Sequence, residues 1–151
     1  MNILLIAGRI AFVAIFVLSG AQKLLDISGT AAMIAPKIVV PAQLAGVAAQ
    51  LEGLTAMSTP QLLAILAGVV ELAGGLLIAA NIGTRAAALL LIVFTAATIF
   101  WFHDFWNMAG AERVNNMIHA LKNLSLIGAL LMLFVIGSWR PSSEGERGEQ
   151  F

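Results

Sequence analysis

Apolar residues in this chain gather in four long stretches, near residues 3–25, 62–80, 85–105 and 118–139. Each stretch approaches or exceeds the roughly 18 residues that a helix needs to cross a hydrocarbon core about 30 Å thick. Residues 81–84 alone separate the second stretch from the third, and so short a turn makes those two helices antiparallel neighbours. The pattern predicts an all-α membrane protein, built as a four-transmembrane-helix antiparallel bundle.

The segment of about 36 residues between the first two stretches is neither polar enough for a plain loop nor long enough to cross a membrane twice. Pro36 and Pro41 interrupt it. After Pro41, the apolar residues Leu44, Val47 and Leu51 recur at helical spacing, while glutamines lie away from their face. This spacing predicts a short interfacial helix between spans one and two.

The composition agrees with a membrane protein, because 60% of the residues are apolar and 11% are charged. Eight basic and eight acidic residues give no net charge, so no nucleic-acid partner is expected. The absence of cysteine excludes disulfides and thiolate metal sites, and a redox role therefore needs a bound cofactor or another subunit. We expect a single transmembrane domain over residues 1–139 and a polar, disordered tail over residues 140–151.

Ionisable residues fall inside the predicted spans, where a charge is costly unless it is paired or hydrated. Arg9 lies roughly 9 Å from the inner end of span one, Glu71 in the middle of span two, and Lys122 about 6 Å inside span four. Arg9, Ser19 and Lys23 share one face of span one, which we expect to point into the bundle. The predicted buried charge network is Arg9, Lys23, Glu71 and Lys122. It is interpreted as a structural ion pair of Glu71 with Arg9 or Lys122, or alternatively as a headgroup site or proton relay. In either case we expect Glu71 within salt-bridge reach of Arg9, Lys23 or Lys122.

A second polar cluster, residues 103–107, stands at the outer end of span three and combines an imidazole, a carboxylate, an amide and two aromatic rings. Lys122 and Asn123 lie near His103 if span four packs alongside span three. The cluster is a candidate ligand site, and the alternative is anchoring at the membrane interface by Trp106. Two histidines without a carboxylate at supporting spacing predict neither a metal site nor haem.

Short motifs follow one another in a specific order along the chain. They are Arg9 with Ser19-Gly20-x-x-Lys23, Glu71-x-x-Gly74-Gly75, Gly83-Thr84-Arg85-x-Ala87, His103-x-x-Trp106-Asn107 and Lys122-Asn123-Leu124. Their order and spacing resemble the DoxX family of small bacterial and archaeal membrane proteins, over nearly the whole chain. The resemblance implies a four-helix membrane bundle. It also implies a link to thiosulfate:quinone oxidoreductase, one subunit of which family members resemble, and to complexes that handle oxidative and thiol stress.

From this resemblance we expect a membrane subunit of an oxidoreductase system that contacts quinone, in the bacterial cytoplasmic (inner) membrane. A quinone needs hydrogen-bond partners for its carbonyl oxygens and an apolar slot for its ring. The expected cofactor-binding residues are His103, Trp106, Lys122 and Asn123. The alternative function is a non-catalytic scaffold or accessory subunit that recruits a partner enzyme, and no catalytic residue is assigned. The expected partners are the lipid bilayer and a protein of a membrane complex, and a small excess of arginine near the chain ends predicts both termini in the cytoplasm.

Overall fold

The computed structural model describes residues 3–137, and every regular element in that range is a helix. In chain order the elements are α1 (Ile3–Leu25), α2 (Ile27–Ile34), η1 (Ala42–Leu44), α3 (Ala45–Thr55), α4 (Thr59–Ala79), α5 (Thr84–Phe102), η2 (Phe105–Asn107) and α6 (Gly110–Ile136). In this part of the chain α1, α4, α5 and α6 are long and apolar enough to cross a membrane. The predicted all-α membrane protein with four spanning helices is therefore confirmed. The predicted tail, residues 140–151, lies outside the described residues.

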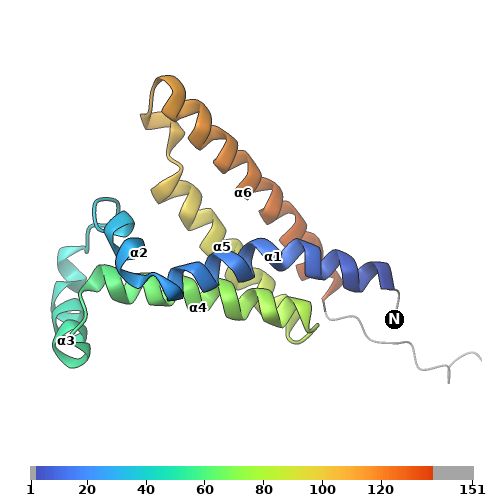
Figure 1. The fold of residues 1–151 in the computed structure, drawn as a ribbon, viewed down its shortest axis with the longest axis horizontal. Helices are drawn as coiled ribbons and strands as arrows, with labels where there is room; N and C mark the ends of the chain where they lie inside the picture. The colour runs from blue at the N-terminus through green and yellow to red at the C-terminus, as the bar shows by residue number, and fades with distance from the viewer. Residues whose placement is uncertain (1–2, 138–151) are drawn as a thin grey trace, which may run out of the picture.

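The spanning helices form two antiparallel pairs, α1 with α4 and α5 with α6, and the two pairs are joined by the contact of α4 with α5 (Figure 1). The pairs meet at the end that carries Ile3 and Gly137 and diverge toward the end that carries α2 and α3. As a result α1 packs along α4 but not along α6 within the described chain.

Glycines allow the backbones of α1 and α4 to approach closely. A Cβ atom on Gly20 would lie 2.6 Å from the backbone nitrogen of Leu72 and 2.7 Å from the carbonyl oxygen of Gly68. Such distances leave no room for any side chain at Gly20. Small residues at a contact are the usual means by which membrane helices associate, because van der Waals packing replaces the hydrophobic effect inside lipid.

Two clusters of buried apolar residues make up the core. The larger cluster lies where the helix pairs meet and includes Phe16, Leu91 and Leu130. The smaller cluster lies toward the divergent end, where Ala31 and Ile34 of α2 pack on α4 and against Phe102 of α5. The short helix α2 thus fills part of the space between the diverging pairs (Figure 1).

Helix α2 was not predicted as a separate element. Its first turn is capped by Asp26, whose Oδ1 accepts a hydrogen bond from the backbone nitrogen of Gly29 at 2.9 Å. An apolar helix of eight residues is too short to be recognised from hydropathy as a span. The predicted helix after Pro41 is present as η1 and α3, and none of its residues is buried.

The start of α6 differs most from the sequence prediction, because the helix begins at Gly110 and not near residue 118. Its first two turns carry Glu112, Arg113 and Asn115, all of them exposed. Hydropathy finds the apolar part of a helix, whereas polar turns that continue the helix beyond the bilayer leave no apolar signal. The additional turns bring Asn116 beside the end of α5.

Candidate functional site

A buried ion pair joins α1 to α4 near the middle of α4. The Nζ atom of Lys23 lies 2.7 Å from Oε2 of Glu71, and Lys23 also donates a hydrogen bond to Oγ of Ser19 at 2.5 Å. The side chain of Glu71 is 9% exposed and that of Lys23 is 26% exposed. Lys23 and Ser19 are four residues apart, so they occupy one face of α1 and approach Glu71 from the same side.

Arg9 contributes to a different contact, at the end where the helix pairs meet. Its guanidinium donates to Oδ1 of Asn81 at 2.5 Å, to the carbonyl oxygen of Ile78 at 3.3 Å and to the carbonyl oxygen of Gly137 at 3.4 Å. Arg85 donates to the carbonyl oxygen of Val135 at 3.4 Å. Both arginines therefore bind carbonyl groups at the C-terminal end of α6, where the helix leaves its last acceptors without helical partners and has its negative dipole end.

The four residues of the predicted charge network therefore lie at three separate places in the structure. Glu71 pairs with Lys23 and not with Arg9 or Lys122. Arg9 lies beside the α4–α5 turn, and Lys122 is exposed on α6 with Nζ 3.4 Å from Nδ1 of His119. Helix periodicity gave the inward faces of Arg9, Lys23 and Glu71 correctly, whereas Lys122 is exposed and does not belong to a buried network. Periodicity also carries no information on how far one helix is displaced along its neighbour.

Polar side chains also link α5 to α6. Oγ1 of Thr98 donates to the carbonyl oxygen of Thr95 at 2.8 Å, and Nδ2 of Asn123 donates to Oγ1 of Thr98 at 3.3 Å. Asn123 is 9% exposed and Thr95 is 3% exposed. Within residues 3–137 the hydroxyl of Thr95 has no hydrogen-bond partner of its own, although it is buried.

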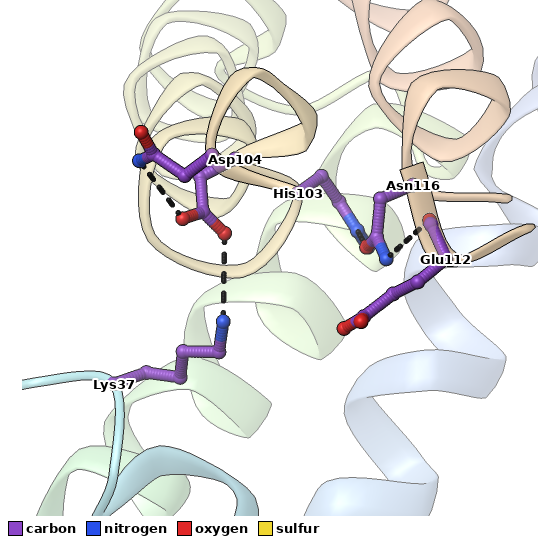
Figure 2. Close-up of polar contacts among 6 residues, drawn as sticks. Lys37, His103, Asp104, Glu112 and Asn116 are labelled. Atoms are coloured by element: carbon purple, nitrogen blue, oxygen red, sulfur yellow. Dashed lines mark hydrogen bonds and ion pairs between the residues drawn. The ribbon is translucent and has the colours of Figure 1, made fainter. Parts of the chain in front are cut away.

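Two histidines stack at the divergent end of the α5–α6 pair. The rings of His103 and His119 have centroids 5.1 Å apart and planes inclined by 18°. Nδ1 of His103 lies 3.1 Å from Oδ1 of Asn116, and Nδ2 of Asn116 donates to the backbone carbonyl of Glu112 at 3.1 Å (Figure 2). The imidazole of His103, at the end of α5, is therefore hydrogen-bonded to Asn116 of α6, and the ring stacked on it, His119, also belongs to α6.

These contacts determine the tautomer of each ring. A backbone carbonyl only accepts hydrogen bonds, so the amide of Asn116 must direct its nitrogen to Glu112 and its oxygen to His103. Neutral His103 then carries its proton on Nδ1 and leaves Nε2 as an acceptor. The ammonium of Lys122 donates to Nδ1 of His119, so neutral His119 carries its proton on Nε2 and presents a donor.

Asp104, the neighbour of His103 in the chain, faces the opposite side. Its Oδ1 lies 3.4 Å from Nζ of Lys37, in the segment after α2, and its Oδ2 accepts a hydrogen bond from Asn107 at 3.2 Å (Figure 2). The Lys37–Asp104 ion pair is 39% and 22% exposed, so its contribution to stability is small. It nevertheless connects the two helix pairs at the end where they diverge.

Of the four predicted cofactor-binding residues, the structure brings His103 and Lys122 together through His119. Asn123 lies behind them and faces Thr98 in the interior. Trp106 is half exposed, with its ring 5.3 Å from that of Phe105 and 6.4 Å from that of Phe100. Sequence reasoning missed Asn116, although its spacing of three residues from His119 and seven from Asn123 places all three on one helical face.

The fold and these contacts define a class, namely an integral membrane protein with four spanning helices and polar groups at the ends and in the middle of its helix pairs. The DoxX family model matches residues 4–104, and the chain belongs to the DoxX family. The inner membrane protein YphA of Escherichia coli (strain K12) is 33% identical over 135 residues, covering 89% of this chain and 84% of that protein. The inner membrane protein YqjF of the same organism is 34% identical over 95 residues, covering 63% of this chain and 69% of that protein. No solved structure matches.

Proposed function

We propose that this protein is an inner-membrane subunit of an oxidoreductase system that binds the ring of a quinone at the His103–His119 pair. The observation that supports this proposal is that the two stacked rings have complementary tautomers. His103 has a free acceptor nitrogen, and His119 has a free donor N–H. A quinone carbonyl accepts a hydrogen bond, and the hydroxyl of the reduced ring donates one. The pair therefore offers a suitable partner to either redox state.

The surroundings support a ligand with an apolar ring. Lys122 adds a positive charge beside His119, and the exposed apolar side chains Ile118 and Leu121 flank it on α6. Sites for such molecules are apolar walls with a few placed polar groups. The chain itself has no cysteine, so electrons would enter and leave through another subunit.

Quinone binding is tested by titrating the purified protein with short-chain ubiquinone and menaquinone analogues and following tryptophan fluorescence. We expect saturable quenching. His103→Ala and Lys122→Ala each remove a hydrogen bond, one of them charged, which corresponds to a Kd about tenfold to a hundredfold higher. Arg113→Gln, at an exposed position on the face of α6 opposite to Lys122, serves as the control with unchanged Kd. Absence of saturation, or equal Kd values in all variants, would refute the proposal.

The inner membrane is proposed because both curated relatives carry that location in their names. Arg9 and Arg85 lie at the end that carries Ile3 and Gly137, and Lys37 and Arg113 lie toward the opposite end, so these four residues are balanced under the positive-inside rule. The arginines that follow α6 in the sequence, Arg140 and Arg147, support a cytoplasmic position for both termini. Thiol labelling of single cysteines introduced at Asn2 and Gln150 tests this orientation, since both should react only from the cytoplasmic face.

A second candidate is a scaffold that recruits a partner enzyme, and α3 favours it. This helix has no buried residue and exposes Val47, Leu51 and Leu54, next to the exposed Leu44 of η1. Photo-crosslinking from Leu54 in native membranes should capture one defined protein if α3 makes the contact. Capture of lipid alone would assign α3 to the membrane surface instead.

A further inference from the structure

Buried polar groups separate the two apolar clusters of the core. On one side lies the cluster with Phe16, Leu91 and Leu130, and on the other lies the cluster of α2 with Ala31 and Ala64. Between them α1 and α4 carry Ser19, Lys23 and Glu71, and α5 and α6 carry Thr95, Thr98 and Asn123. The ion pair with Ser19 therefore belongs to one helix pair, and the hydroxyls of Thr95 and Thr98 belong to the other.

Glu71 and Thr95 lie at the same level of the α4–α5 contact. A Cβ atom on Gly74 would lie 2.9 Å from Cγ of Leu91, so these two residues touch across the contact. Glu71 precedes Gly74 by three residues, and Thr95 follows Leu91 by four, which keeps each on the same face of its helix. Because α4 and α5 are antiparallel, the step back along α4 from Gly74 to Glu71 and the step forward along α5 from Leu91 to Thr95 both lead about one turn toward the same end of the molecule.

Among the described residues the buried hydroxyl of Thr95 has no hydrogen-bond partner, so we expect an ordered water molecule beside it. A buried polar group without a partner is costly, and an ordered water is the usual remedy where a second polar group is near. The carboxylate of Glu71 is the second polar group, at the level of Thr95 on the facing helix. A bridging water would satisfy both and connect the ion pair of one helix pair with the hydroxyls of the other.

The polar groups continue from Thr95 toward only one end of the molecule. The hydroxyl of Thr98, one turn after Thr95, donates to the backbone carbonyl of Thr95 and accepts from Asn123, and His119 lies one turn before Asn123 on the same face of α6. That series ends at the His103–His119 pair. In the other direction the core is apolar, and Phe16, Leu91 and Leu130 are at most 3% exposed.

The geometry points to Glu71 as a proton-accepting carboxylate that is reached by water from the His103–His119 end and closed to the end that carries Gly137. A hydronium ion arriving along Thr98 and Thr95 transfers its proton to the carboxylate, and a water molecule remains. Lys23 keeps its ammonium protons and its hydrogen bond to Ser19, so the layer gains one positive charge. Lys23 lies in the last turn of α1, where the long side chain can extend its ammonium toward the headgroups.

Lys23 is the charged side chain in direct contact with Glu71. Of the other helices packed against α4, α2 carries no ionisable side chain, and α3 carries Glu52, which is bonded to Thr59 at the start of α4. Helix α1 also carries Arg9, which is bonded to Asn81, and α5 carries Arg85, which lies in its first turn and is directed to the end of α6. Neither this route for water nor the transfer of a proton to Glu71 requires a bound quinone.

Accessibility to silver ions tests the route, because the ion is close to water in size and the chain has no cysteine of its own. Single cysteines are introduced at Thr95 and Thr98, in membrane vesicles of both orientations. Cysteines at the exposed positions Asn115 and Ile82 report which face of the vesicle is outside, and Leu91→Cys is the buried control.

We expect Thr95→Cys and Thr98→Cys to react with silver only in vesicles in which Asn115→Cys reacts, and Leu91→Cys to stay unreactive in both orientations. Reaction from the Ile82 face, from both faces, or from neither face would overturn the one-sided route. The near-equal size of threonine and cysteine keeps the packing intact in these variants.

Infrared spectroscopy of the protein in lipid nanodiscs tests the proton on Glu71. A protonated-carboxyl band that is present at low pH and absent in Glu71→Gln is expected, and it should grow after a downward pH jump. Thr95→Val should slow that growth at least about tenfold, because it removes the hydroxyl that holds the bridging water. Ser125→Ala, on the exposed face of α6, is the control with an unchanged rate. If no such band appears between about pH 9 and about pH 4, Glu71 is not a proton acceptor.

Discussion

The ion pair of Lys23 and Glu71 predicts that its two halves contribute unequally to stability. Lys23→Met leaves the carboxylate of Glu71, whose side chain is only 9% exposed, without its charged partner. Loss of one member of a buried pair costs about 3–5 kcal/mol, so this variant should approach that range unless Glu71 becomes protonated. Glu71→Gln is milder, because the glutamine oxygen still accepts from Lys23 and the ammonium keeps its bond to Ser19. We expect about 1–2 kcal/mol for it.

The double variant Lys23→Met with Glu71→Gln separates charge from packing. It contains no buried charge, so it should be more stable than Lys23→Met alone, as when a buried ion pair is replaced by groups of similar size. Stability is measured as the free energy of unfolding in mixed micelles, from a titration with sodium dodecyl sulfate followed by circular dichroism. Equal losses in the two single variants, or strictly additive losses in the double variant, would contradict the contact described here.

Two further predictions concern packing and capping. Gly20→Ala places a Cβ atom against the backbone of Leu72, so it should lower the free energy of unfolding by about 1–3 kcal/mol, whereas Gly46→Ala, with open space around it, should be neutral or stabilising in the same titration. The backbone nitrogen and hydroxyl of Thr59 donate to Glu52 at 2.6 and 2.7 Å and lower the pKa of that carboxyl. Because the folded-state pKa lies below the unfolded one, this cap is fully present above the ordinary carboxyl pKa and is lost as the pH falls through the depressed value. Amide exchange at the start of α4 should therefore lose protection below about pH 4 in the wild type, and Glu52→Ala should lack this change.

Hydropathy predicted the four spans because a long apolar helix leaves a strong and local signal. The boundaries of α6 and the existence of α2 were missed for the opposite reason, since the start of α6 is polar and α2 is too short to span a membrane. The position of Glu71 inside the protein followed from its spacing to Gly68 and Gly75, which mark the face toward α1.

Helix periodicity alone could not predict which basic residue pairs with Glu71. Arg9 and Lys23 share a face of α1, and only the displacement of α1 along α4 decides which of them reaches the carboxylate. That displacement is set by the contact of Gly20 with Gly68 and Leu72, a three-dimensional fit that depends on both helices at once. The same reasoning applies to His103 and Asn116, which meet only because α6 extends two turns further than its apolar stretch.

The pairing of α1 with α4 has a consequence for biosynthesis. Lys23 and Glu71 are 48 residues apart, so at about 5–20 residues per second the ribosome adds Glu71 roughly 2–10 seconds after Lys23. During that interval α1 can enter the bilayer with its lysine unpaired. Lys23 lies in the last turn of α1, where a long side chain can extend to the headgroups and remain hydrated. The arrival of α4 then draws the lysine inward, so that the ion pair closes only when the second span has been inserted.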